Sequence, residues 1–321
     1  MKIGIFGTGA YGIALTSVLT KNDCDITMWT KFEEEKNNLE QTRQNTKYFE
    51  GYKIDERIKI TNNIEECVKN KDLLIIAIPV EFIEELLINM KKYIKDNHIL
   101  IASKGIEKEN GLFISEIVEK YLDTKNIGII SGPSFAIDLI TENPIGLSLA
   151  SKSNETMNIV KNAFKNGCIK IKETEDIYGT ELCGALKNIF AIATGILDGL
   201  ETTDSTKATF MTEVFNSMKD ILNKFNCNKE TMASYAGIGD LLLTCTSVKS
   251  RNYCFGKLIG QKRNRDKEDY LNNNTVEGYN TLKSVMQLLK RKNFDIEIIN
   301  LIYKVVIEDY NPEILLSFIK Y

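Results

Sequence analysis

The chain has 321 residues, 43% of them apolar, which is enough to bury the cores of two domains. Its 41 basic and 44 acidic residues leave a net charge of −3, which argues against a nucleic-acid surface as the main function and favours small-molecule partners. Seven scattered cysteines with no CxxC pair are typical of reduced thiols in a cytoplasmic protein and suggest no metal site. The longest apolar run, at 73–80, is too short to cross a bilayer, so we expect a soluble protein with no integral membrane segment.

The first predicted elements are a strand, a tight turn and a helix. An apolar run at 2–6 precedes GTGAYG, in which Gly7, Gly9 and Gly12 form a GxGxxG pattern. Between a strand and a helix this pattern indicates a dinucleotide site. Gly7 permits the turn, Gly9 lets a pyrophosphate approach the backbone, and Gly12 permits close packing, while the helix N-terminus attracts the anion. The alternative is a glycine turn used only for packing.

The second predicted strand, at 24–29, bears on the choice of cofactor. An NAD-selective site places an acid at the end of this strand, about 20 residues after the glycine turn. Here Thr30 and Lys31 follow the strand, and a hydroxyl next to a cation suits the 2′-phosphate of NADP. The acids at 33–35 remain able to fold back and serve the ribose of NAD. The sequence therefore favours NADP over NAD.

Further apolar runs predict buried strands, and helical patterns lie between the first of them. This alternation predicts a parallel sheet. The strands are expected at 72–78, 98–103, 127–131 and 146–151.

From about residue 173 the apolar residues recur at spacings of three and four, as in amphipathic helices. Glycine and charged residues at 167–175 interrupt the earlier pattern. We therefore predict an NAD(P)-binding domain over 1–172 and an all-helical substrate domain over 173–321. Asn311 and Pro312 predict the start of a last short helix, and the polar stretch at 260–275 predicts a solvated loop.

One helix, at 180–197, carries Lys187 beside Asn188 in an apolar setting. An unpaired ammonium in an apolar interior costs several kcal/mol, so such a lysine has a carboxylate partner or a chemical role. Pairing with Glu181 or extension of the side chain to water are the alternatives to a ligand site. The positions three, four and seven residues away on the same face are small and leave room for a ligand: Thr180, Cys183, Gly184, Ala191 and Thr194.

Five motifs occur in order along the chain and are specific as a series. Together with the glycine turn, they resemble the soluble bacterial NAD(P)-dependent glycerol-3-phosphate dehydrogenases, over a span reaching at least residue 281. The motifs are KGIE at 104–107, SGPSFA at 131–136, GALKNIFAIATGILDGL at 184–200, AGIGDLLLTCTSVKSRNYCFG at 236–256 and VEG at 276–278.

The resemblance implies a Rossmann-type doubly wound parallel sheet domain followed by an all-α substrate domain, with the active site in the cleft between them. It implies the interconversion of dihydroxyacetone phosphate and sn-glycerol 3-phosphate with NADP or NAD, feeding glycerophospholipid synthesis. It also implies a homodimer in the cytoplasm.

The resemblance assigns the proton donor and acceptor to Lys187. A lysine whose pKa is lowered by burial or a neighbouring cation exchanges protons near neutrality, whereas His98, the single histidine, lies far from every motif and is predicted to be structural. The implied catalytic residues are Lys187, Lys104, Asn188, Asp240 and Thr244.

The remaining implied site residues bind substrate or cofactor, and no metal is implied. A helix beginning near Gly239 would place Asp240 and Thr244 on one face; an ordinary first-turn acid and a buried threonine are the alternative. The implied substrate-binding residues are Lys104, Gly132, Ser134, Lys187, Asp240, Ser250, Arg251 and Asn252. The implied cofactor-binding residues are Gly7, Gly9, Ala10, Tyr11, Gly12, Lys31, Tyr48, Lys104, Ala136, Arg251 and Glu277.

The chain departs from the family pattern at three places. Ala10 and Tyr11 stand where the family commonly has Ser-Trp, and Ser205 stands where it usually has asparagine. Thr212, Glu213 and Val214 replace a threonine-arginine-glycine series, so an arginine has become an acid. The alternatives are a related hydroxy-acid dehydrogenase and a catalytically weak NAD(P)-binding regulator.

Overall fold

The computed structural model describes residues 1–320, except for the side chain of Asn264, and it consists of two compact units. Unit 1 comprises Met1–Lys104 and Ile114–Ile177. Unit 2 comprises Gly105–Phe113 and the chain from Tyr178 onward. The chain therefore leaves unit 1 after Lys104, contributes the short segment 105–113 to unit 2, and returns to unit 1 at Ile114.

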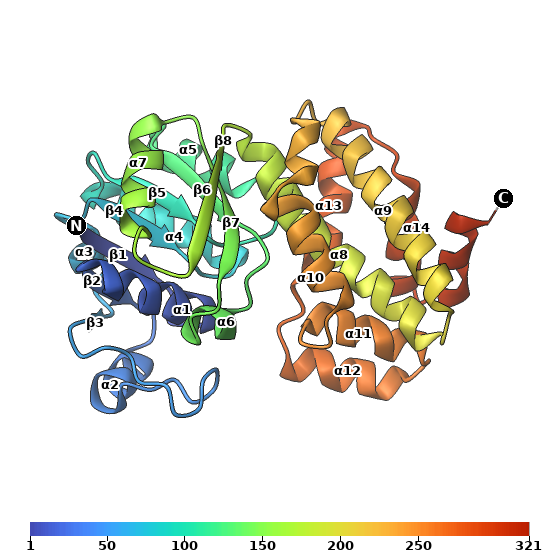
Figure 1. The fold of residues 1–321 in the computed structure, drawn as a ribbon, viewed down its shortest axis with the longest axis horizontal. Coiled ribbons are helices and arrows are strands. Elements are labelled where there is room, and N and C mark those ends of the chain that lie inside the picture. Colours follow the sequence, from blue (N-terminus) through green and yellow to red (C-terminus); the bar gives the residue numbers. More distant parts are fainter. Residues whose placement is uncertain (321) are drawn as a thin grey trace. The chain divides into compact units, whose positions relative to one another are not determined.

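Unit 1 is built on an eight-stranded sheet of order β3-β2-β1-β4-β5-β6-β7-β8 (Figure 1). The strands from β3 to β6 are all parallel, and the order reverses between β1 and β4, as in dinucleotide-binding folds. The Rossmann-type prediction is confirmed. The strands are β1 Lys2–Phe6, β2 Asp25–Trp29, β3 Lys59–Thr61, β4 Leu73–Ile76, β5 His98–Ile101, β6 Ile127–Ser131, β7 Ile145–Ser151 and β8 Ile169–Thr174.

The far edge of the sheet differs from the all-parallel expectation. β7 runs antiparallel to β6, and β8 runs parallel to β7. The connection from β6 to β7 contains only the five-residue helix α6, Ala136–Ile140, whereas a parallel return needs a longer crossover. The sheet is therefore mixed, and the stretch at 167–175, expected to interrupt the pattern, supplies its edge strand.

Helices cover both faces of the sheet. α1 (Ala10–Leu19) and α7 (Asn154–Ala163) belong to the apolar core on the face of Ile3 and Ile5. α3 lies on the opposite face, because its Cys67 carbonyl abuts Gly4, and α4 packs against both α3 and α5. The other helices of unit 1 are α2 Glu33–Thr42, α3 Ile64–Val68, α4 Ile83–Met90 and α5 Ile114–Leu122.

Unit 2 is helical and is organised around α8, Ile177–Gly199. By length and mean hydropathy, α8 is the single helix of the described residues that could cross a membrane, but its apolar window is 94% buried inside the protein. The other helices are α9 Asp204–Lys224, α10 Asp240–Thr246, α11 Arg251–Gly260, α12 Asn264–Asn273, α13 Glu277–Lys292 and α14 Glu297–Val306, followed by the 3₁₀ helix η6 Pro312–Ile319.

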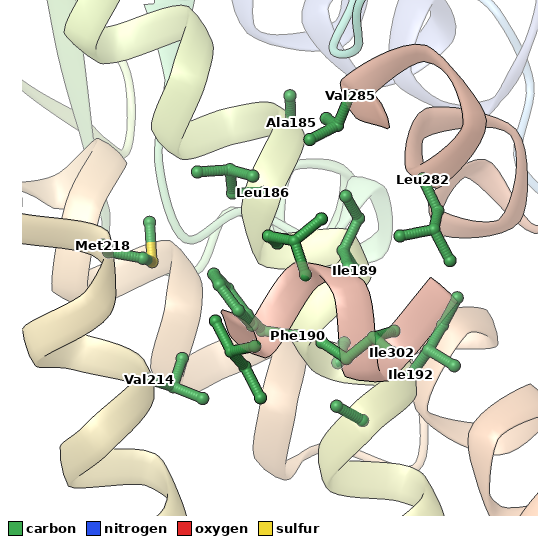
Figure 2. Close-up of a cluster of buried hydrophobic side chains, with 14 of the residues drawn as sticks. Ala185, Leu186, Ile189, Phe190, Ile192, Val214, Met218, Leu282, Val285 and Ile302 are labelled. Carbon is green, nitrogen blue, oxygen red and sulfur yellow. The ribbon is translucent and has the colours of Figure 1, made fainter. Parts of the chain in front are cut away.

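The core of unit 2 forms on the apolar sides of these helices. Figure 2 shows side chains of α8 in the middle of this cluster, with residues of α9, α13 and α14 around them. A helix surrounded in this way is a core helix, which explains its apolar composition. The labelled side chains are Ala185, Leu186, Ile189, Phe190, Ile192, Val214, Met218, Leu282, Val285 and Ile302.

The prediction of a loop at 260–275 is wrong, because α12 lies there. Tyr270 and Leu271 pack against the core of unit 2, and the Tyr270 ring stacks on Phe255 with centroids 6.4 Å apart. Two apolar residues thus anchor a helix whose composition is otherwise polar. The last predicted helix is present as η6, where the Asn311 side chain accepts the amide of Glu313 at 3.2 Å.

α8 and α11 approach each other closely through glycine. A Cβ atom on Gly195 would lie 2.1 Å from the Tyr253 carbonyl oxygen, and one on Gly256 would lie 2.0 Å from the Ile192 carbonyl oxygen. Neither position accepts a side chain without a backbone shift. Some of the small residues on α8 therefore serve helix packing.

Candidate active site

The glycine turn leaves open space at one of its three glycines. Gly7 has a φ of +124°, and a Cβ there would lie 2.4 Å from the Ala77 carbonyl oxygen. A Cβ on Gly12 would lie 2.1 Å from the Gly7 carbonyl oxygen, whereas one on Gly9 would meet no atom within 4 Å. No side chain caps the N-terminus of α1, so its amides suit an anion. The residues present fit the pyrophosphate of a dinucleotide.

The segment after β6 lies beside this turn. Tyr11 Oη is 3.0 Å from Ser134 Oγ, which in turn donates to the Gly132 carbonyl at 3.2 Å. α6, which begins at Ala136, packs on α1. The structure therefore brings three residues implied by the resemblance to the glycine turn, where Tyr11 contacts one of them: Gly132, Ser134 and Ala136.

The end of β2 carries a carboxylate that the sequence left as an alternative. Thr30 Oγ1 donates a hydrogen bond to Glu35 Oε2, so this acid of α2 folds back to the strand end. Lys31 Nζ lies 2.8 Å from both oxygens of Glu85. Sequence reasoning missed Glu85, because no local pattern links α4 to the end of β2.

The loop after α2 contacts the glycine turn through a residue that sequence reasoning also missed. Asn45 Nδ2 donates to the Thr8 carbonyl at 3.1 Å. The implied cofactor residue Tyr48 follows in this loop with 39% of its surface exposed, and Lys47 Nζ lies 5.6 Å from its ring centre. A polar residue in a loop carries no sequence signal of such a contact.

Unit 2 contains a buried ion pair between Lys187 of α8 and Asp240 of α10. Lys187 is 8% exposed and Asp240 is 1% exposed, and Nζ lies 2.6 Å from Oδ1. Thr244, one turn further along α10, donates to the Asp240 carbonyl at 2.7 Å. The helix predicted to begin near Gly239 is confirmed, and Lys187 has a carboxylate partner on another helix.

A chain of hydrogen bonds next to this pair joins α8, α11 and α13. Asn188 Nδ2 donates to Glu277 Oε2 at 3.0 Å, and Asn188 Oδ1 accepts from Asn252 Nδ2 at 3.0 Å. Asn252 Oδ1 accepts the amide of Gly278 at 2.8 Å. Glu277, which the resemblance places at the cofactor, therefore contacts the neighbour of Lys187 in this structure.

Cys245 also lies beside the ion pair, with Sγ 3.9 Å from the Lys187 carbonyl oxygen. Burial raises the pKa of the Cys245 thiol to about 12, the largest effect on it, against a smaller opposing effect from Thr194. The thiol is neutral at physiological pH, so it is no nucleophile.

The other implied residues lie at the starts and ends of elements. Ser250 caps α11 by accepting the amide of Tyr253 at 3.3 Å, and Arg251 next to it is exposed. Lys104 is the last residue of the first segment of unit 1 and is half-buried. His98 is buried, with Nδ1 2.8 Å from Thr156 Oγ1, as expected of a structural residue.

Two of the three departures from the family pattern lie on α9, and the third, at Ala10 and Tyr11, lies at the start of α1. Ser205 is exposed in the first turn of α9, and Glu213 is half-buried one residue before the buried Val214. Nothing in the structure explains the change to an acid at Glu213.

Comparisons with known proteins agree across both units. Residues 2–157 match the model of the NAD-dependent glycerol-3-phosphate dehydrogenase N-terminus, and residues 176–317 match that of its C-terminus. A glycerol-3-phosphate dehydrogenase [NAD(P)+] of Staphylococcus haemolyticus is 35% identical over 315 residues, which are 97% of this chain and 95% of that protein. One of Staphylococcus carnosus is 33% identical over 309 residues, covering 95% and 93%.

A solved structure extends this agreement to the fold. The crystal structure of glycerol-3-phosphate dehydrogenase from Coxiella burnetii aligns with a TM-score of 0.92 at 27% identity and covers 99% of this chain and 98% of that one. The matches confirm the resemblance and NAD(P) as the cofactor class. The chain belongs to the NAD-dependent glycerol-3-phosphate dehydrogenase family.

Proposed function

We propose that the chain reduces dihydroxyacetone phosphate to sn-glycerol 3-phosphate with Lys187 as the proton donor, and that the same group accepts the proton in the reverse direction. The observation that carries this proposal is the buried Lys187–Asp240 ion pair at 2.6 Å. A buried lysine held by one carboxylate is a fixed, charged donor, because the neighbouring carboxylate favours the ammonium form. Bound NAD(P)H supplies the hydride.

The protein residues act on the oxygen that becomes an alkoxide. As the hydride reaches C2, the carbonyl π electrons move to oxygen, and the Lys187 ammonium gives that oxygen a proton and becomes a neutral amine. Solvent then restores the proton to Lys187. Asp240 orients the ammonium, and Thr244 stabilises the turn of α10 from which Asp240 projects.

Asn188 and Lys104 assist at the carbonyl in this proposal. One N–H of Asn188 donates to Glu277, and its Oδ1 accepts from Asn252. The second N–H has no partner among the described side chains and suits a substrate oxygen. Lys104 adds a second positive charge for the same oxygen. Gly132 and Ser134 are proposed as further substrate contacts.

The substrate phosphate is assigned to the start of α11. Arg251 is exposed and offers a planar donor fork. The buried Asn252 stands next to it, and Ser250 caps the helix. The amides of this ten-residue helix favour an anion as well.

The remaining expectations are proposals supported by the family. We propose that the protein is a homodimer in the cytoplasm and that its product feeds glycerophospholipid synthesis. Residues 1–172 and 173–321 would then act as the cofactor domain and the substrate domain.

The activity is tested by following nicotinamide absorbance with dihydroxyacetone phosphate, with NADH and NADPH in parallel. Oxidation with this substrate, and competition by inorganic phosphate, support the proposal. Oxidation only with non-phosphorylated hydroxy-acid precursors would instead indicate the related dehydrogenase. Nucleotide binding without turnover of any substrate would indicate a regulator.

A further inference from the structure

The adenosine ribose site of unit 1 carries negative charge at the point where the two cofactors differ. In this fold the ribose 2′ position lies at the carboxyl end of β2, where an acid accepts from a 2′-hydroxyl and a cation pairs with a 2′-phosphate. β2 ends at Trp29, followed by Thr30. The side chains that gather there therefore bear on the choice between NAD and NADP.

The first of these side chains is Glu35. Its Oε2 accepts a hydrogen bond from Oγ1 of Thr30, which is 3% exposed. The contact fixes the carboxylate at the strand end, although Glu35 belongs to the first turn of α2. Glu33 and Glu34 precede it in the same turn. A 2′-phosphate, which carries nearly two negative charges, would meet this acidic turn.

The second is Lys31, the cation that favours NADP when the sequence is considered alone. Its Nζ lies 2.8 Å from both carboxylate oxygens of Glu85. A lysine bound by both oxygens of one acid gives little net positive charge to a ligand. Lys31 therefore shares its charge with Glu85 in this structure.

Other cations of the same region also have acceptors. Lys36 lies 3.0 Å from Glu40, and Lys59 lies 2.8 Å from Glu66. Arg43 donates from Nη1 to the Ile58 carbonyl at 2.8 Å. The two ion pairs leave less positive charge for a 2′-phosphate, and the Arg43 bond engages one of its donors.

We propose that this chain selects NAD(H) over NADP(H), with Glu35, positioned by Thr30, as the residue that accepts the ribose 2′-hydroxyl and disfavours a 2′-phosphate. This inference deepens the proposed function by naming its cofactor and rests on it for the reaction. Glu85 contributes because its ion pair with Lys31 makes the ammonium less available to a 2′-phosphate.

The first test is binding, which needs no turnover. Calorimetry on the full chain compares ADP-ribose with 2′-phospho-ADP-ribose at fixed ionic strength. We expect ADP-ribose to bind at least about tenfold more tightly, a difference of about 1.4 kcal/mol. Equal binding or preference for the phosphorylated ligand would overturn the inference. A loss of the proposed reaction with this ratio intact would overturn the proposed function alone.

Matched variants test the assignment to Glu35. Glu35→Gln and Glu33→Gln remove the same charge from the same helical turn, but the structure gives only Glu35 the bond to Thr30. We expect Glu35→Gln to reduce the binding ratio about fivefold or more and Glu33→Gln to change it less than about twofold, because exposed charges are screened. Equal effects of the two substitutions would contradict the role of Glu35.

A third variant acts through Lys31. Glu85→Gln removes its carboxylate partner, so we expect the affinity for 2′-phospho-ADP-ribose to rise several-fold while that for ADP-ribose stays within about twofold. Circular dichroism confirms that each variant is folded. An unchanged affinity for the phosphorylated ligand would show that Lys31 does not reach the 2′ position.

Discussion

Lys187 and Asp240, 53 positions apart in the chain, form a buried ion pair with 2.6 Å between Nζ and Oδ1. The two residues belong to α8 and α10, so the pair connects two helices of unit 2 as well as two chemical groups. Taking either charge away leaves the other buried without its partner, which is costly. Catalytic and structural effects of substitutions here therefore have to be measured separately.

Lys187→Met should greatly reduce turnover while leaving the cofactor bound. Removing a positioned proton donor lowers the rate by about 10²–10⁴, and we expect a fall in kcat of about 10³ with NADH affinity changed less than about threefold. Steady-state kinetics and nucleotide titration measure the two quantities. Lys219→Met, at an exposed position of α9, is the matched control. Near-normal kcat in Lys187→Met would refute the central role of this lysine.

Asp240→Asn should destabilise unit 2 more than a double substitution does. Removing the buried carboxylate partner of Lys187 costs about 3–5 kcal/mol. Replacing both residues, as in Lys187→Met with Asp240→Asn, removes the stranded charge and restores a part of that loss. Chemical denaturation of the wild type, both single variants and the double variant gives the coupling energy. Additive losses would show that the ion pair contributes no stability.

Gly9→Ala and Gly12→Ala should separate ligand binding from folding. The space beside Gly9 is open and its φ is −72°, so Gly9→Ala keeps the unfolding free energy but weakens cofactor binding by about tenfold. Gly12→Ala brings a Cβ within 2.1 Å of the Gly7 carbonyl oxygen and should cost about 2 kcal/mol of stability. Thermal unfolding and nucleotide titration of both variants test this contrast. An unchanged cofactor affinity in Gly9→Ala would show that the pyrophosphate does not bind at this turn.

Asp198 should make the stability of unit 2 depend on pH in the acid range. Its oxygens lie 2.8 Å from Lys257 and 3.1 Å from Lys207, and the bond from Lys257, the largest cause, lowers the pKa of Asp198 to about 2. Because this value lies below the unfolded pKa of about 3.9, the stabilisation is present above pH 4 and is lost as pH falls towards 2.

The matched variant for this pH effect is Asp198→Asn. We expect it to lower the unfolding free energy by about 1 kcal/mol at pH 6, because solvent still screens this partly exposed network, and by less at pH 3. Urea titrations at the two pH values give the difference. A difference that grows on acidification would contradict the direction of the pKa shift.

Arg251→Ala and Asn252→Ala should both raise KM for dihydroxyacetone phosphate, but only Asn252→Ala should also lower the unfolding free energy. Arg251 is exposed, so its loss raises KM for dihydroxyacetone phosphate with little change in unfolding free energy. Asn252 donates to Asn188 and accepts from Gly278, so its loss also costs about 1–3 kcal/mol. Kinetics with and without inorganic phosphate, and thermal unfolding, measure both. An unaffected KM in Arg251→Ala would place the phosphate elsewhere.

The sequence predicts those parts of the molecule whose signals are local. The strand, glycine turn and helix at the start of the chain, the long helix α8 and the helix after Gly239 are each indicated by residues within the element itself. Each of these needed only a short stretch of sequence. The Lys187–Asp240 contact did not, because it joins residues 53 positions apart.

Other parts depend on contacts between distant segments. α12 is polar except for Tyr270 and Leu271, and its anchoring on Phe255 is visible only in the fold. The antiparallel direction of β7 relative to β6 depends on the short connection around α6. The hydrogen bonds that Asn188 donates to Glu277 and Lys31 donates to Glu85 span 89 and 54 positions, and no periodic pattern encodes them.

The glycine contacts between α8 and α11 have a mechanical consequence. Backbone atoms, and not flexible side chains, set the spacing of these helices at Gly195 and Gly256, so neither helix can slide along the other without a clash. Lys187 lies on one helix and Arg251 begins the other. In the proposed function, this contact between the two helices would fix the span between the proton donor and the phosphate anchor.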